Sequence, residues 1–145
     1  MKKIILSSLI ILCISASNIS WSANFEDGKK AYDSLDFNTA FQELLPEAQQ
    51  GNYEAQAMVA WMYREGKGTY KDSKQAFYWI QKAAKQGLIS AQNIAGVSYL
   101  FGHGVGKDRK MAKYWIGRAR ENGHIGANEV WNKYKLYEKN IKILG

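Results

Sequence analysis

This chain has few of the residue types that form disulfides, break helices, bind metals or act in catalysis. Its 145 residues include one cysteine, one proline and two histidines. The cysteine, Cys13, lies in an N-terminal apolar stretch, so no disulfide can hold the remainder of the chain, even in an oxidising compartment. His103 and His124 have no second histidine or cysteine at the spacing of a zinc site. Motifs for phosphate loops and serine nucleophiles are also absent. We therefore expect a protein that is not an enzyme, that binds no cofactor and no metal, and that is held by packed helices.

Long apolar runs are equally scarce. The one candidate, residues 4–14, is shorter than the roughly 20 apolar residues that a membrane-spanning helix needs. It directly follows Lys2 and Lys3. Small and polar residues then lead to Ala23, which completes the layout of a secretory signal peptide. We predict a signal peptide over residues 1–23, cleaved after Ser22 or Ala23, and a periplasmic or secreted mature chain with no stable membrane span.

The mature chain has a modest excess of positive charge. Without Lys2 and Lys3, 18 basic and 13 acidic residues remain, so the formal net charge falls from +7 to +5. The basic residues are scattered and form no run of five or more. This pattern favours a solvated helical surface over a patch for nucleic acid or membrane, and no nucleic-acid partner is expected.

A period of 36 residues is the dominant pattern of the sequence. When residues 54–89 are aligned with residues 90–125, 15 of the 36 pairs are identical and no gap is needed. The shared pairs include Ala55/Ala91, Gln56/Gln92, Tyr63/Tyr99, Gly66/Gly102, Gly68/Gly104, Asp72/Asp108, Trp79/Trp115 and Gly87/Gly123. A fixed period of this size indicates a repeat architecture.

Each repeat has the pattern of two helices. Glycines end the first helix, and Asp72 or Asp108 can cap the free N–H groups at the start of the second. Pro46 is expected to kink or break an earlier helix of the same register, and Trp79 and Trp115 are expected to lie in the core. The expected helices cover residues 25–34, 36–50, 55–65, 72–86, 91–101, 108–122 and 127–142. The sequence thus predicts an all-α fold, an α-solenoid of about three to four helix pairs and about seven helices.

The repeat resembles a known family. Its string A-Q-x-x-x-[AG]-x-x-Y-x-x-G-x-G, continued by K-D-x-K-x-A-x-Y-W-I-x-x-A and a closing glycine, is similar to the Sel1-like repeat, a relative of the tetratricopeptide repeat. After the signal peptide, the resemblance implies a tetratricopeptide-like first pair at residues 24–51, repeats at 53–88 and 89–124, and a capping helix within 125–145. It also implies a concave groove lined by first helices and a role in protein–protein contact. Some cysteine-rich secreted relatives are linked to β-lactam binding, but this mature chain lacks their cysteines.

The resemblance also points to a binding face. Offsets from the packing tyrosine in tetratricopeptide helices select positions that differ between the copies, as residues that determine specificity should. They mix aromatic and charged side chains, which is typical of binding hot spots. The predicted partner-binding residues are Trp61, Arg64, Glu65, Asn93, Val97, Leu100, Phe101, Glu129, Lys133 and Tyr137, with Ala57 and Leu136 at corresponding positions. The alternative is that Trp61, Leu100 and Phe101 pack against the next first helix.

These observations predict a non-enzymatic, exported protein-binding module. By analogy with short exported proteins encoded beside toxins, the specific hypothesis is an immunity protein that binds and neutralises a secreted toxic effector, for example a phospholipase. One alternative is an envelope or secreted adaptor for another protein. The alternative from another class is an enzyme that acts on cell-wall material or β-lactams.

Overall fold

The computed structural model describes residues 24–137, and the predicted signal peptide and residues 138–145 lie outside this part. The described residues form seven helical segments and no strand, so the predicted all-α fold is confirmed. The first segment covers residues 24–33. It is followed by α2 (Phe37–Gln49), α3 (Tyr53–Glu65), α4 (Ser73–Lys85), α5 (Ile89–Phe101), α6 (Arg109–Glu121) and α7 (Ile125–Lys133).

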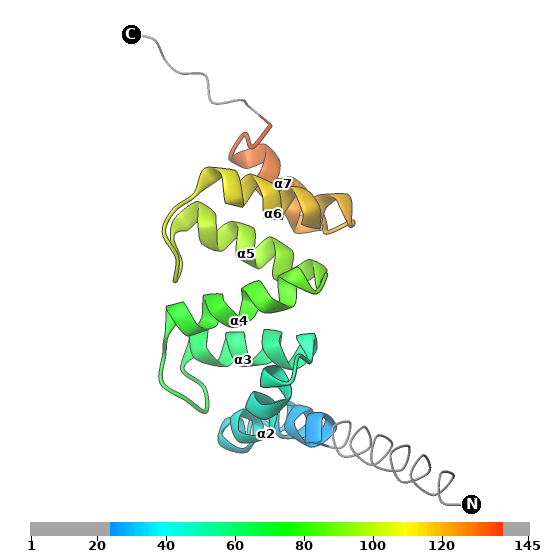
Figure 1. Cartoon of the computed structure of the whole chain (residues 1–145), viewed down its shortest axis with the longest axis vertical. Helices are drawn as coiled ribbons and strands as arrows, with labels where there is room; N and C mark the ends of the chain where they lie inside the picture. The colour runs from blue at the N-terminus through cyan, green and yellow to red at the C-terminus, as the bar shows by residue number, and fades with distance from the viewer. Residues whose placement is uncertain (1–23, 138–145) are drawn as a thin grey trace, which may run out of the picture.

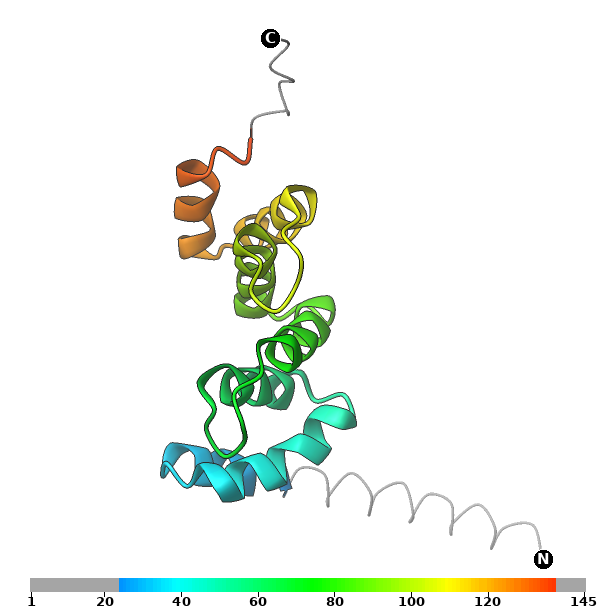
Figure 2. The same ribbon diagram turned by 90° about the vertical axis from the view of Figure 1, so that its left-hand side faces the viewer.

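The helices form a solenoid, because each packs mainly on its neighbours in sequence. Helix pairs follow one another along the long axis, from the α2 end to the α7 end (Figure 1). Long loops after α3 and α5 lie at the left edge of Figure 1, and the short turns after α4 and α6 lie at the right edge. A 90° turn shows that successive pairs are rotated relative to one another about this axis (Figure 2).

The aspartates that repeat with the 36-residue period begin the second helices, as predicted. The Asp72 carboxylate accepts hydrogen bonds from the backbone N–H groups of Lys74 and Gln75, at 2.8 and 3.0 Å. Asp108 makes the equivalent bonds at the start of α6, and Asp36 makes one at the start of α2. Each aspartate thus satisfies N–H groups that a helix leaves without an internal partner.

Buried glutamines at equivalent positions of the two repeats join each repeat to the helix pair before it. Gln56 donates its amide to the Ala48 carbonyl at 3.0 Å and accepts a hydrogen bond from Gln86 at 2.9 Å. One period later, Gln92 bonds the Ala84 carbonyl and accepts from Asn122. Because Gln56 and Gln92 are buried, these bonds satisfy polar groups that would otherwise be costly to remove from water. We call these arrangements the glutamine joints.

Aromatic pairs and tight loops repeat in the same way. The ring of Tyr63 lies edge-on to Phe41 with centroids 5.3 Å apart, and Tyr99 lies edge-on to Phe77 at 5.1 Å. In the loop after α5, Gly104 has a φ of +71°, and a Cβ there would lie 1.9 Å from the Ser73 carbonyl oxygen. Glycine is therefore required for this loop to pack on the first turn of α4.

The core is continuous along most of the solenoid. Trp79 and Trp115, predicted to be core residues, are each 5% exposed. They belong to a large cluster that runs from Phe25 to Trp115, while a smaller cluster around Ile116 joins α6 to α7. Trp79 and Trp115 thus occupy equivalent buried positions in the two repeats.

Two sequence-based expectations about helix ends need correction. Of the two outcomes expected at Pro46, a kink or a break, the break does not occur: α2 runs on to Gln49 and is held by the buried Leu44 and Ala48. The terminal helix ends at Lys133 instead of near residue 142.

The early end of α7 has a local cause. Lys135 adopts a left-handed backbone with a φ of +48°, and the N–H of Leu136 then bonds back to the Trp131 carbonyl at 3.0 Å. This is the hydrogen-bond pattern of a helix stop. It buries Leu136 to 1% exposure, and Arg109 donates to the carbonyls of Tyr134 and Lys135. The chain therefore leaves the helix after Lys133 and turns so that the Leu136 side chain is buried.

Candidate binding groove

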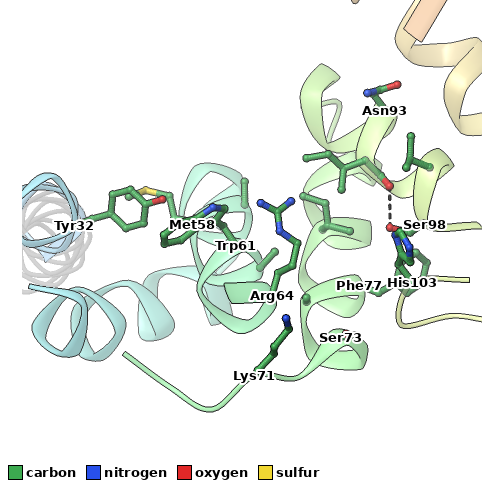
Figure 3. Close-up of a pocket in the computed structure, with 16 residues that line it drawn as sticks. Tyr32, Met58, Trp61, Arg64, Lys71, Ser73, Phe77, Asn93, Ser98 and His103 are labelled. Atoms are coloured by element: carbon green, nitrogen blue, oxygen red, sulfur yellow. Dashed lines mark hydrogen bonds between the residues drawn. The ribbon is translucent and has the colours of Figure 1, made fainter. Parts of the chain in front are cut away.

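A groove lies between α3 and α5, with α4 as its floor. Its volume is about 710 Å³, and Figure 3 shows the lining side chains converging from these helices and from the loops after α3 and α5. Lys71 and His103 come from the two loops, whereas Asn93 lies near the start of α5. The groove therefore has a loop end and an opposite, Asn93 end.

Most of the groove surface is apolar. Trp61 of α3 faces Ile94 and Val97 of α5 across a floor that includes Phe77 and Ile80 of α4. The Phe77 and Ile80 side chains are almost fully buried, so the floor belongs to the core and is rigidly placed. An apolar side chain from a partner would lose contact with water here.

Trp61 is held in place from behind. Its ring lies edge-on to Tyr32 with centroids 5.2 Å apart and is tilted against Phe37 at 5.6 Å. Tyr32 itself lines the groove, and burial raises the pKa of its hydroxyl, an effect that the nearby Arg64 charge opposes. Trp61 is thus a preorganised aromatic surface that loses little freedom when a partner docks.

The loop end of the groove is cationic. Arg64 and Lys71 both line it, and in Figure 3 the Lys71 ammonium points toward the Arg64 side of the groove. Arg64 Nε pairs with Glu65 at 2.7 Å, but Glu65 does not line the groove. His103 also lines this end and stacks on Phe101 with ring centroids 5.7 Å apart.

The opposite end presents an amide. The Asn93 side-chain oxygen is buried and has no hydrogen-bond partner among the described residues. Ser98, by contrast, donates its hydroxyl to the Ile94 carbonyl at 2.9 Å, the dashed line in Figure 3. A buried acceptor without a donor is costly, and because protein atoms cover this oxygen it is not exposed to a group docked in the groove.

The structure brings some of the predicted binding residues together and separates others. Trp61, Arg64, Asn93 and Val97 line the groove, as does Ala57. Leu100 instead packs into the small core cluster with α6 and α7, which is the alternative that the sequence left open.

The other predicted positions also lie outside the groove lining. Phe101 is 39% exposed and contacts Tyr134 edge-on at 5.3 Å. Glu129 and Lys133 are exposed on α7, whereas Tyr137 is exposed in the turn that follows it. Leu136 is buried. These residues therefore do not line the groove, although Phe101 stacks on His103, which does.

Sequence reasoning missed several of the lining residues. Phe77 and Ile80 form the floor from α4, Tyr32 comes from the first helical segment, and Lys71 and His103 come from loops. The one available signal was the position of Lys71 and His103 beside the repeated glycine turns.

Other kinds of site have little support within residues 24–137. Within residues 24–137, no group of three or more His, Cys, Asp or Glu side chains is placed to hold a metal ion. The helices in that range fall short of the length and apolar character needed for a membrane span.

Comparisons with known proteins match this architecture. The family description "Sel1 repeat" fits residues 54–88 and 89–124. A Sel1 repeat protein from Oxalobacter formigenes is similar with a TM-score of 0.71 and 29% identity, over 78% of this chain and 46% of that protein. A protective antigen of uropathogenic Escherichia coli with an SLR fold gives a TM-score of 0.74 and 28% identity, over 87% and 28% of the two chains.

A third structure shares the fold alone. Cysteine-rich protein B of Helicobacter pylori has a TM-score of 0.60 and 22% identity, over 72% of this chain and 94% of that one. The present chain spans less than half of each of the first two relatives. Among curated proteins, none matches this sequence.

Proposed function

Residues 54–124 of this chain belong to the Sel1 repeat family, and from that premise we propose that the protein acts by binding another protein in the groove between α3 and α5. Sel1 repeat proteins are generally protein-binding modules. The observation that carries the proposal is the contrast between an invariant scaffold and a variable groove. The glutamine joints and aromatic pairs recur in both repeats, while Trp61 and Arg64 correspond to Val97 and Leu100.

The finer proposal concerns where the protein acts and on what. We propose export through the predicted signal peptide, residues 1–23, followed by binding and neutralisation of a secreted toxic effector such as a phospholipase. Support for export comes from the charged start and the apolar stretch of residues 4–14. Support for inhibition is the analogy with short exported immunity proteins, together with a groove able to grip one protein segment.

The binding site can be tested with a photoreactive residue at position 61 of the full chain in its native cell. Cross-linking there should capture one dominant protein, whereas the same residue at position 137, outside the groove, should not. With that partner purified, Trp61→Ala should weaken binding by about 2 kcal/mol or more, roughly thirtyfold, and Tyr137→Ala should leave it unchanged. Equal affinities for the two folded variants would remove the groove from the proposal.

Export and immunity need separate tests. Osmotic shock should release the full-length product but not a version that lacks residues 1–23. Cells without the gene should be killed by wild-type siblings, and the full gene should rescue them while the leaderless gene should not. Equal survival of mutant and wild-type cells would leave the adaptor as the better function.

The enzymatic alternative has the weakest support. Its basis was the β-lactam link of cysteine-rich relatives, and the only cysteine here is Cys13, within the predicted signal peptide. Hydrolysis of peptidoglycan fragments or a chromogenic β-lactam by the purified protein, lost on groove substitution, would favour that alternative.

A further inference from the structure

We propose that the segment bound in the groove is acidic and apolar: apolar side chains lie along the α4 floor, and an aspartate or glutamate lies at the loop end between Arg64 and Lys71. This inference deepens the protein-binding role proposed above and rests on it. Three observations carry it, namely the charge of the lining, the apolar floor and the size of the groove.

The charge of the lining is one-sided. Arg64, Lys71 and His103 line the groove, and no carboxylate does. The neighbouring acids are engaged elsewhere, because Asp72 caps α4 and Glu65 holds only Arg64 Nε. The terminal nitrogens of Arg64 have no hydrogen-bond partner among the described residues, and Lys71 forms no ion pair there. Cations on the lining of an apolar groove favour a carboxylate and disfavour a cationic segment.

The floor selects apolar side chains beside that carboxylate. Trp61, Phe77 and Val97 line the groove, and Trp61 and Phe77 also pack in the large core cluster. A hollow of about 710 Å³ is within the range that accommodates a small ligand or a few side chains, and not a folded domain. The occupant is therefore one segment of a partner, anchored by apolar residues.

The test is selection from a random dodecapeptide library displayed on phage, against the purified full-length product. The double variant Arg64→Glu/Lys71→Glu is selected in parallel, with Lys85→Glu as a matched control because Lys85 is an exposed cation outside the groove. Circular dichroism and melting temperature establish that each variant is folded. Should the reversal variant not fold, Arg64→Gln/Lys71→Gln replaces it.

We expect the parent and the control to select peptides that combine apolar residues with Asp or Glu, and the reversal variant to lose them. Changing the acidic residue of a selected peptide to its amide should weaken binding to the parent by about tenfold in fluorescence anisotropy, a typical effect for a partly buried charge pair. The same change should have no effect on binding to the Arg64→Gln/Lys71→Gln variant.

Three results would overturn the inference. In the first, the selected peptides have no excess of acidic residues. In the second, the Trp61→Ala variant binds every selected peptide. In the third, the parent and the reversal variant select the same peptides. Loss of binding to phosphatidylglycerol vesicles by the reversal variant, with peptide selection unchanged, would assign the cations to a lipid. Each of these outcomes leaves the cross-linking, export and survival tests of the proposed function standing.

Discussion

Gly104→Ala is the sharpest test of how the repeats are held together. Gly104 lies in the loop after α5, where its φ of +71° is one that side chains rarely adopt. The added Cβ would lie 1.9 Å from the carbonyl oxygen of Ser73, in the first turn of α4. Two other glycines of the loop separate the causes. Gly102 shares the left-handed backbone without a severe contact, and Gly106 has no atom within 4 Å of its Cβ and no such φ.

The expected magnitudes follow from these differences. Gly106→Ala should be neutral or should stabilise by up to about 1 kcal/mol, because alanine restricts the unfolded chain. Gly102→Ala should cost about 1–2 kcal/mol, the penalty of a left-handed residue. Gly104→Ala carries that penalty and must also push a backbone carbonyl away by more than an ångström. We expect a total of about 3–5 kcal/mol, which lowers Tm by roughly 10–20 °C in a domain of this size.

Urea and thermal unfolding followed by circular dichroism measure the three variants. The order of stability should be Gly106→Ala, then Gly102→Ala, then Gly104→Ala. If Gly104→Ala and Gly102→Ala have the same free energy of unfolding, the close approach to Ser73 adds nothing to the cost of the substitution. The loop then does not anchor one repeat to the pair before it. Gly68→Ala provides an independent repetition, since a Cβ there would lie 2.0 Å from the Phe37 carbonyl oxygen.

Three further predictions concern the core, a glutamine joint and a helix cap. Trp79→Ala and Trp115→Ala should each cost about 3–5 kcal/mol in urea unfolding, because both side chains are 5% exposed; a melting temperature equal to the parent's would contradict this. Asn122→Ala should cost about 1–3 kcal/mol by leaving the buried Gln92 oxygen without its donor, and a double-mutant cycle with Gln92→Ala should show coupling. The pKa of Asp36 is lowered by hydrogen bonds from Thr39, so its contribution to stability is present above the ordinary pKa of 3.8 and is lost as the pH falls through the lower folded-state value. The difference in Tm between the parent and Asp36→Ala should accordingly be constant near neutral pH and disappear in acid; a difference that persists at the lowest pH would contradict the cap.

The fold could be predicted from the sequence because the residues that build it are the ones that repeat. Gln56 and Gln92 recur since each fills the same joint, and Asp72 and Asp108 recur since each caps the same kind of helix. A structural role that occurs in both repeats places the same residue type at the same position of each, so it appears in the sequence as a period. The left-handed backbone of Lys135 could not be predicted in this way, because lysine does not favour that conformation and the conformation follows from the burial of Leu136.

The groove was only partly predictable for a related reason. Offsets from Tyr63 and Tyr99 locate side chains on a first helix, and they place Trp61 and Val97 in the groove. They do not show how far successive helix pairs rotate, and this rotation brings the α4 floor into the groove. Phe77 therefore serves the core and the groove at once, which no pattern within a single helix could reveal.

The glutamine joints have an evolutionary consequence. The joint at Gln56 and the joint at Gln92 use the same residue type against the same backbone carbonyl, one period apart. A gene duplication that inserts another 36-residue unit between Leu88 and Ile89 would therefore meet compatible neighbours on both sides. A unit appended beyond α7 would meet a helix stop and the buried Leu136 instead. The lineage can thus lengthen its groove by internal duplication, one unit at a time, and so change the length of segment that it binds, because the inserted unit supplies equivalent partners for the contacts that now join α4 to α5.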